Sequence, residues 1–385
     1  MKASIDSDRS LIRPGRRIAL VISSFAPPAG GAERLVIALG NELTKKGCLV
    51  SLLTFDAGPG DSAYALDSSV KHIALVRPAE PHSLRQRCQR ILRRIQEVRR
   101  GVKEARAEVV IAALDLMNIL TLIAVLGLKI PVVVWEGVRP ADFQLGWGWR
   151  ILRLLLYPLA QRVVLLQEEH RADFPAYLHS KCRVISNFAS VPDPAGAGPV
   201  SRPPGGGRTL ISLGRLVPQK QFDLLVGVFG RLAPLFPEWR LVIWGEGPDR
   251  RKLEQLILDL NLEDRVLLPG FTLAPYEELQ TADVFVCSSR FEGFSLALIE
   301  ALACGLPVVS FNCQSNLTGL IRDGENGIVV PLNDAAALSA ALSKVMNDEA
   351  LRGRLGMEAQ KVKGSFNLEN FLRKWEVLLA EVLPD

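Results

Sequence analysis

Short runs rich in Val, Ile and Leu alternate with helix-forming stretches along most of this 385-residue chain. In the first half these runs are RIALVIS at 17–23, CLVSLLTF at 48–55, VVIAAL at 109–114, PVVVWEG at 131–137 and RVVLLQ at 162–167. Strands that alternate with helices form parallel sheets whose two faces are covered by the helices. The pattern therefore predicts an α/β fold built on a doubly wound parallel sheet.

The same alternation restarts in the second half, after a segment that cannot hold regular structure. Between Ser190 and Gly207, ten of eighteen residues are Pro or Gly, which excludes a helix or an interior strand. A chain of this length also favours two domains. We predict an N-terminal domain at 1–190, a linker at 191–207, a C-terminal doubly wound domain at 208–365 and a final helix at 366–385.

The composition is typical of a globular protein, with 48% hydrophobic and 23% charged residues. No run reaches the about eighteen consecutive apolar residues of a membrane-spanning helix. The polar N-terminus lacks the apolar core of a secretory signal, so we expect a cytoplasmic protein. Six cysteines, at positions 48, 88, 182, 287, 304 and 313, form no CxxC pair. This favours free buried thiols over a structural zinc site.

Positive charge is concentrated in the first half of the chain. Residues 1–195 hold 27 Lys and Arg against 18 Asp and Glu, and the remainder holds 19 against 23. The segment 84–106 carries nine Lys or Arg and two Glu, with apolar residues at helical spacing. It is typical of a membrane-surface helix, with a solvated face on an ordinary packed helix as the alternative. The apolar stretch at 147–164 is interpreted as a core helix, and no nucleic-acid module appears.

Two cations follow the first strand of the second half, within GRLVPQK at 214–220. Arg215 and Lys220 lie in a predicted loop that leads into a helix. A guanidinium and an ammonium beside helix N–H groups suit a diphosphate, and a pair of solvated surface cations is the alternative. GEGP at 245–248 follows the next strand and allows close backbone approach to a ligand, although a turn of this kind alone is weak evidence.

Two glutamates interrupt the apolar segment at 290–309. Glu292 lies in a predicted turn with Gly293, and Glu300 lies in the helix that follows and ends at Gly305. The two carboxylates would be roughly 10–12 Å apart along the helix axis, comparable to the reach of a nucleotide sugar. Backbone N–H groups at the helix start would then lie beside the diphosphate; they belong to Phe294, Ser295 and Leu296. Alternatively, Glu292 is a helix-start acid and Glu300 a partly solvated helix residue.

These motifs together, with LPGF at 268–271, resemble the retaining glycosyltransferases of family 4. The resemblance extends from Ile18 to about Leu379, and its most specific part is the pair of glutamates separated by seven residues. It implies a GT-B fold, in which two Rossmann-like domains face a central cleft and the final helix crosses back to the N-terminal domain. It implies no cofactor and no metal.

The resemblance also implies roles for individual residues. Arg215 and Lys220 would hold the donor diphosphate, Glu300 the ribose hydroxyls, and Glu292 the transferred sugar near its reacting centre. The remaining positions assigned to the donor site are Gly30 and Gly31 in the N-terminal glycine loop, Glu246 in the GEGP turn, Leu268, Pro269 and Gly270 beside the nucleobase, and Gly293, Phe294, Ser295 and Leu296 at the helix start.

The sequence departs from the family pattern on the acceptor side. Many relatives carry a His after the strand at 131–135, where this chain has Glu136. Glu136 could orient or deprotonate the acceptor hydroxyl, or it could be a helix-capping or surface acid. Asn118 and Arg139 are also assigned to the acceptor site, and for Asn118 a buried hydrogen-bonded side chain is the alternative.

The resemblance implies a glycosyltransferase that moves a hexose or N-acetylhexosamine from a UDP-sugar to a glycan or polyprenyl-diphosphate-linked acceptor in cell-surface polysaccharide synthesis. We expect peripheral contact with the inner face of the plasma membrane through 84–106. The alternatives are a GT-B nucleotide-sugar epimerase or phosphorylase, and a non-catalytic partner subunit. A Rossmann dehydrogenase is disfavoured because no GxGxxG motif follows a strand.

Overall fold

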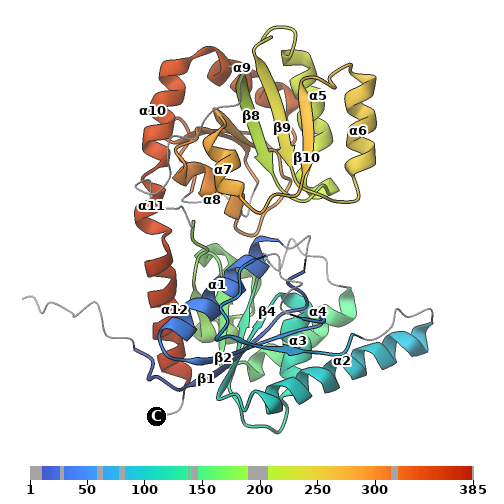
Figure 1. The fold of residues 1–385 in the computed structure, drawn as a ribbon, viewed down its shortest axis with the longest axis vertical. Helices are drawn as coiled ribbons and strands as arrows, with labels where there is room; N and C mark the ends of the chain where they lie inside the picture. The colour runs from blue at the N-terminus through green and yellow to red at the C-terminus, as the bar shows by residue number, and fades with distance from the viewer. Residues whose placement is uncertain are drawn as a thin grey trace, which may run out of the picture. The chain divides into compact units, whose positions relative to one another are not determined.

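The computed structural model describes residues 11–26, 30–58, 64–77, 83–137, 139, 146–189, 207–313 and 320–383 (Figure 1). The chain divides into two compact units. The first unit comprises Met1–Ser186 together with Glu369–Asp385, and the second comprises Asn187–Leu368. Apart from Gly207, the segment predicted as a linker lies outside the described residues.

The first unit is built on a seven-stranded parallel sheet in the order β3-β2-β1-β4-β5-β6-β7. The order reverses between β1 and β4, as in a doubly wound sheet. Its interior strands are almost entirely apolar, because helices cover both faces. The strands are β1 (Arg17–Val21), β2 (Leu49–Thr54), β3 (Lys71–Ala74), β4 (Val109–Ala113), β5 (Val132–Trp135), β6 (Arg162–Leu165) and β7 (Cys182–Val184).

Among the described residues before position 160, the α-helices of the first unit are α1 (Gly31–Lys45), α2 (Leu84–Glu104), α3 (Asp115–Ala124) and α4 (Trp147–Leu156). Helix α12 (Leu368–Val382) also packs here, although it is the last helix of the chain. The fully buried Trp375 ring contacts the Trp135 ring edge-on at 4.9 Å. The Lys46 ammonium lies 2.9 Å from the Glu376 carboxylate. Both apolar and ionic contacts therefore hold α12 in this unit.

The second unit has a six-stranded parallel sheet in the order β10-β9-β8-β11-β12-β13. This order reverses between β8 and β11. The strands are β8 (Arg208–Leu213), β9 (Trp239–Trp244), β10 (Val266–Gly270), β11 (Val284–Cys287), β12 (Val308–Phe311) and β13 (Gly327–Val330). The prediction of two doubly wound α/β domains is confirmed.

Helices on both faces of this second sheet complete the unit. They are α5 (Phe222–Leu232), α6 (Arg250–Asp259), α7 (Pro275–Gln280), α8 (Leu296–Ala303), α9 (Ala335–Asn347), α10 (Glu349–Ala359) and α11 (Val362–Ser365). The core is formed chiefly by apolar residues of β8, β9 and α5 with α9, and it includes the fully buried Trp239.

The interpretation of 147–164 as a core helix is wrong for α4. No residue of this helix is fully buried, and Trp147 is 80% exposed. One face of α4 packs on the core, and the opposite, equally apolar face does not. The six cysteines are free, but Cys88 is exposed and Cys304 is only partly buried, so the expectation of buried thiols fails for these two. No helix of the described residues is long and apolar enough to cross a membrane.

Candidate functional site

The strand order of the second sheet places two loops side by side at its carboxyl edge. β8 and β11 are neighbours, and each leads to its helix in a different direction, which leaves a crevice of the kind where α/β sheets bind ligands. Arg215 and Lys220 follow β8, whereas Glu292 follows β11. The structure therefore brings together the GRLVPQK motif at 214–220 and the segment at 290–309 that carries the two glutamates.

Lys220 and Glu292 form an ion pair across this crevice. Their side chains are only 16% and 9% exposed. The Ser289 hydroxyl donates to the same carboxylate oxygen, Glu292 Oε1, at 2.6 Å. Burial alone would lower the pKa of Lys220, but the adjacent Glu292 carboxylate outweighs it and raises that pKa above the usual lysine value. Lys220 is therefore a fixed positive charge at neutral pH.

Further hydrogen bonds tie the loop after β8 to the loop after β11. The Gln219 amide donates to Phe291 O at 2.7 Å, and Arg290 N donates to Gln219 O at 2.9 Å. The Ser288 hydroxyl donates to Lys220 O at 2.7 Å. These bonds hold the backbone on both sides of the Lys220–Glu292 pair, so the pair is positioned before any ligand arrives.

Glycines allow the loop after β9 to pack directly on the loop after β8. Gly214 N donates to Trp244 O at 3.0 Å, and Leu216 N donates to Glu246 O at 2.9 Å. A Cβ atom on Gly247 would lie 2.7 Å from the Leu216 carbonyl carbon, which backbone atoms cannot accommodate. The exposed Arg215 side chain extends from this fixed backbone, and it forms no ion pair with a described residue.

The GEGP turn also reaches the predicted nucleobase position. The Arg250 guanidinium donates two hydrogen bonds to the Glu246 carboxylate, from Nη2 at 2.7 Å and from Nε at 2.9 Å. Arg250 Nη2 donates in addition to Leu268 O at 3.2 Å. The hydrogen bonds from Arg250 lower the pKa of Glu246 below its usual value. Arg250 therefore connects Glu246 with Leu268, Pro269 and Gly270.

Helix α8 holds the second glutamate. The helix begins after Ser295 and ends before Gly305, whose φ of +79° is a left-handed conformation that favours glycine. Glu300 lies inside α8 and is 2% exposed, so it is not the partly solvated residue of the alternative interpretation. Just before the helix, Phe294 O accepts a hydrogen bond from the Asn187 amide at 3.1 Å. Gly293 and Ser295 are buried beside Phe294, and Leu296 is partly buried.

A buried polar cluster lies at the carboxyl edge of the first sheet. Glu136 follows β5 directly and is 1% exposed, so it is not a surface acid. The Tyr157 hydroxyl donates to Glu136 Oε1. Asn118 donates to Trp135 O at 3.2 Å and to the Tyr157 hydroxyl at 3.3 Å. The sequence did not predict Tyr157, because it lies 21 positions from Glu136 with an uninformative apolar stretch between them.

The other first-unit positions have well-defined partners. Asn118 is fully buried, which agrees with the alternative interpretation of a buried hydrogen-bonded side chain. The Arg139 guanidinium binds the Asp173 carboxylate through two hydrogen bonds, at 2.7 and 3.1 Å. Gly30 N donates to the Glu33 carboxylate at 2.9 Å, and Gly31 is the first residue of α1.

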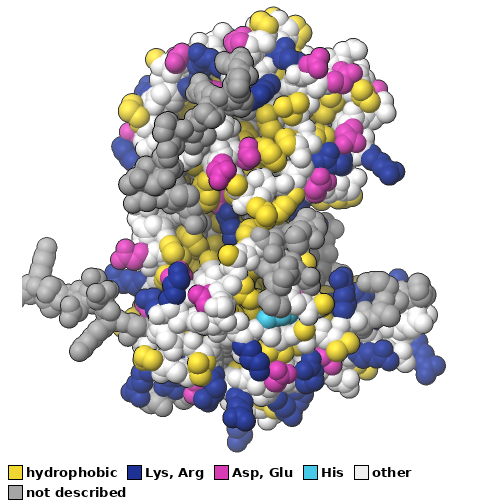
Figure 2. All heavy atoms as spheres, in the orientation of Figure 1, with side chains coloured by type: hydrophobic (Ala, Val, Ile, Leu, Met, Phe, Trp, Pro, Cys, Tyr) yellow, Lys and Arg dark blue, Asp and Glu magenta, His cyan; other side chains and the backbone are white. Residues whose placement is uncertain are grey.

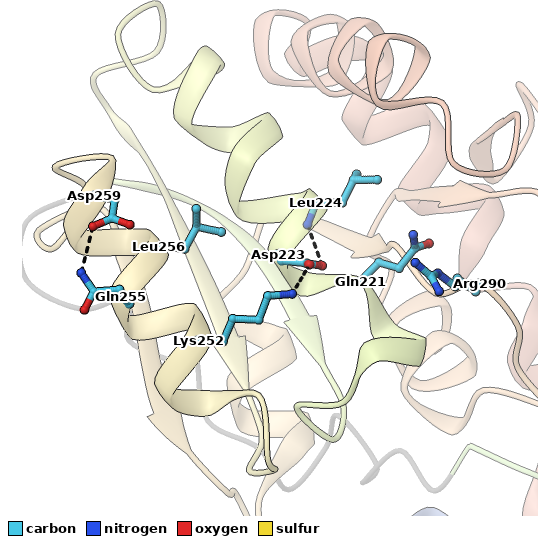
Figure 3. Close-up of a pocket in the computed structure, with 8 residues that line it drawn as sticks. All are labelled: Gln221, Asp223, Leu224, Lys252, Gln255, Leu256, Asp259 and Arg290. Carbon is cyan, nitrogen blue, oxygen red and sulfur yellow. Dashed lines mark hydrogen bonds and ion pairs between the residues drawn. The ribbon is translucent and has the colours of Figure 1, made fainter.

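A separate hollow of about 690 Å³ opens between α5 and α6 (Figure 3). Lys252 and Asp223 form an ion pair in it at 2.5 Å. The hollow contains none of the predicted site residues; its lining is Gln221, Asp223, Leu224, Lys252, Gln255, Leu256, Asp259 and Arg290. It adjoins the loops that carry Lys220 and Glu292, because Gln221 and Arg290 belong to these loops.

Both halves of the chain match glycosyltransferase family models. Residues 29–191 match the model described as glycosyltransferase family 4. Residues 199–362 match the model described as glycosyl transferases group 1. The predicted site residues, from Gly30 to Glu300, all fall within these two matches.

Named relatives of this chain are also transferases that act in glycan or polysaccharide synthesis. The chain is 26% identical to the GalNAc-alpha-(1->4)-GalNAc-alpha-(1->3)-diNAcBac-PP-undecaprenol alpha-1,4-N-acetyl-D-galactosaminyltransferase of Campylobacter jejuni, over 95% of this chain and 99% of that protein. It is 32% identical to an exopolysaccharide phosphotransferase of Streptomyces coelicolor over 66% of this chain. That match spans only 26% of the Streptomyces protein.

Solved structures share the fold along almost the whole chain. A sucrose-phosphate synthase from Thermosynechococcus elongatus superposes with a TM-score of 0.77 at 20% identity, over 95% of this chain and 98% of that one. Anabaena HepE in complex with UDP and glucose superposes with a TM-score of 0.75 at 18% identity, over 95% and 99%. With a family match in each half and this shared fold, the chain belongs to the GT-B glycosyltransferases.

Proposed function

We propose that this protein is a retaining glycosyltransferase that transfers a hexose or N-acetylhexosamine from a UDP-sugar to a glycan or polyprenyl-diphosphate-linked acceptor in cell-surface polysaccharide synthesis. The observation that carries the proposal is the Lys220–Glu292 pair at the crevice between β8 and β11. A fixed cation and a carboxylate at this position suit the two ends of the bond that breaks, because diphosphate leaves with negative charge and the sugar becomes positive.

The donor diphosphate would lie between the loop after β8 and the start of α8. Arg215 offers an exposed guanidinium and Lys220 a fixed ammonium, and the first N–H groups of α8 add their partial positive charge. Glu300 would accept hydrogen bonds from the ribose hydroxyls. The nucleobase would lie against residues 268–270, which the Arg250–Glu246 contact holds in place.

The transfer breaks the bond between the sugar anomeric carbon and the diphosphate oxygen, and it forms a bond to the acceptor hydroxyl oxygen. Attack from the face of the departing diphosphate retains the anomeric configuration without an enzyme nucleophile. The acceptor proton passes to the leaving diphosphate. Glu292 would stabilise the positive sugar or orient its hydroxyls, and Lys220 would neutralise the charge that grows on the diphosphate.

We assign acceptor binding to the first unit. Glu136, fixed by Tyr157, would orient the acceptor hydroxyl, with Asn118 and Arg139 supporting the site. We also assign Gly30 and Gly31 to binding of the donor phosphate. The undecaprenol-linked acceptor in the name of the Campylobacter relative supports a lipid-linked acceptor. The basic helix α2 would contact an anionic membrane at the inner face of the plasma membrane.

A panel of UDP- and GDP-sugars tests the proposal, with nucleotide release measured in the presence and absence of a polyprenyl-diphosphate glycan. We expect acceptor-dependent release of UDP and a product whose anomeric configuration, measured by NMR, equals that of the donor. Glu300→Gln and Arg215→Ala should each lower this release about 100-fold in folded protein. Conversion of the UDP-sugar to an isomer without acceptor would instead indicate an epimerase, and undiminished turnover in both variants would refute the site.

A further inference from the structure

Helix α4 packs on the first unit with only one of its two apolar faces. Trp149, Leu152 and Leu156 lie against the core. On the other side, Trp147 is 80% and Leu155 66% exposed. The spacing of these exposed residues along the chain puts them on one stripe of the helix and on the turn that follows it. We name this stripe the α4 outer face; its members are Trp147, Ile151, Leu154, Leu155 and Leu159.

An outer face of this kind requires an occupant. Single exposed leucines are ordinary on protein surfaces, but five large apolar side chains on one helical stripe and the turn that follows it mark an interaction site. The exposed Arg150 lies on the same helix. Trp147, at the start of the helix, is the side-chain type that prefers the boundary between water and hydrocarbon. The α4 outer face therefore has the composition of an interfacial helix.

The basic helix α2 lies in the same helical layer of the first unit as α4. Helices α2 and α4 both contact α3, and all three helices pack into the core beneath them. Because helices on one sheet face turn their outer sides away from that sheet, α2 and α4 expose their outer faces to the same side. Figure 1 shows α2 running along the edge of the unit, and Figure 2 shows Lys and Arg side chains in the same region.

Helix α2 carries cations that are exposed to solvent. Arg85, Arg87 and Arg93 are exposed. None of the three forms an ion pair with another described residue. Other arginines of α2 are engaged within the protein: Arg99 donates to Ala124 O at 2.6 Å, and Arg100 binds Glu97 at 2.9 Å. The free cations are therefore concentrated toward the N-terminal part of α2.

We propose that the α4 outer face inserts into the boundary between headgroups and acyl chains of an anionic lipid bilayer, while the α2 arginines bind the lipid headgroups. Apolar insertion beside a cationic helix fits a surface that is negative outside and hydrocarbon inside. A second copy of this chain would bring the two cationic helices together, which disfavours self-association. The inference deepens the proposed function, because a lipid-linked acceptor is reached from a membrane surface.

Vesicle flotation of the full chain tests this proposal. Vesicles of phosphatidylglycerol and phosphatidylcholine are compared with vesicles of phosphatidylcholine alone, at low and high salt. We expect wild type to float with anionic vesicles and Leu155→Ser to bind about 10-fold more weakly. Leu258→Ser is the matched control, since Leu258 lies on α6 of the second unit and is 51% exposed. Quenching of tryptophan fluorescence by brominated lipid should largely disappear in Trp147→Phe.

Each contrary outcome overturns the proposal. Binding of Leu155→Ser equal to wild type would exclude insertion of the α4 outer face, as would failure of wild type to bind any vesicle. A wild-type dimer in analytical ultracentrifugation that Leu155→Ser dissociates would identify a second copy as the occupant. UDP release in solution, measured without vesicles and with the polyprenyl-diphosphate glycan as acceptor, should be the same in Leu155→Ser and wild type. Its absence from both would refute the proposed function while leaving the vesicle result valid.

Discussion

A Cβ atom added to Gly247 would lie 2.7 Å from the carbonyl carbon of Leu216, so these residues pack closely only because one is a glycine. Gly247→Ala should therefore displace the loop that carries Arg215. We expect it to lower the free energy of unfolding by about 2 kcal/mol and to weaken UDP binding, as measured by urea denaturation and calorimetry.

Gly227→Ala is the control for this substitution. Gly227 lies within α5, and its added Cβ would meet no heavy atom within 4 Å. Alanine favours a helix over glycine, so this variant should gain about 0.5–1 kcal/mol. If both variants lost stability equally, the effect at Gly247 would not come from its contact with Leu216.

The Lys220–Glu292 pair should behave as one unit. Lys220→Met leaves the largely buried Glu292 carboxylate without its cation, and we expect a loss of about 3 kcal/mol in the free energy of unfolding. The double variant Lys220→Met/Glu292→Gln should lose less than the sum of the two single variants. A double-mutant cycle by urea denaturation measures this coupling; strictly additive losses would contradict it.

Substitution of Arg215 should lower the catalytic rate without lowering the stability of the protein. Its side chain is exposed on a loop whose backbone other residues hold. Arg215→Ala should leave stability within about 0.5 kcal/mol of wild type. Because one charge-stabilising donor is removed, kcat should fall about 100-fold. Arg231→Ala, an exposed arginine near the end of α5, should change neither quantity; equal rates in the two variants would exclude a role for Arg215.

Tyr157 is expected to position Glu136. Tyr157→Phe removes the hydroxyl that Glu136 and Asn118 share, which should cost about 1–2 kcal/mol of stability. With Glu136 less constrained, kcat should fall about 10-fold, while the Kd of UDP stays unchanged because neither Tyr157 nor Glu136 is assigned to the donor site. Steady-state kinetics and calorimetry separate the two effects. Lost stability with an unchanged kcat would assign Tyr157 a structural role only.

Cysteine alkylation should depend steeply on pH at one position. Burial raises the pKa of the Cys304 thiol to about 11. Below that pKa the reactive thiolate increases about tenfold for each pH unit, so alkylation of Cys304 should be slow at pH 8 and accelerate toward pH 10. The exposed Cys88 provides an accessible comparison. Peptide mass spectrometry after iodoacetamide treatment measures both, and rapid labelling of Cys304 at pH 8 would contradict its burial.

Features encoded locally could be predicted from the sequence. The turn and helix after β11 follow from Gly293, from the apolar run up to Ala303 and from Gly305, whose left-handed backbone ends the helix. The loop and helix after β8 are equally local. Neighbouring residues alone specify these elements, so no knowledge of the rest of the chain is needed.

The strands that the sequence analysis missed all lie at sheet edges. β3, β7 and β13 have only three or four residues, and each pairs on one side only. The edge strands β3 and β7 carry polar or charged residues within their short runs, KHIA and CRV, whereas the interior strand β5 (VVVW) is apolar throughout at four residues. Their apolar signal is therefore too weak to distinguish them from loops.

Contacts between distant residues were beyond sequence reasoning. Lys220 and Glu292 are 72 positions apart, and both were assigned to the donor without any sign that they pair. For helix α4, the sequence predicted more burial than the structure shows. Because both of its faces are apolar, hydrophobicity alone predicts complete burial, and only the packing of one face reveals the other as exposed.

Helix α12 completes the core of a unit whose other elements end at β7. During synthesis, the ribosome therefore delivers every residue of the second unit before it delivers Trp375, the partner of Trp135. The apolar surface around Trp135 therefore stays uncovered until Trp375 has been made. Completion of the first core thus depends on residues that follow the whole of the second unit.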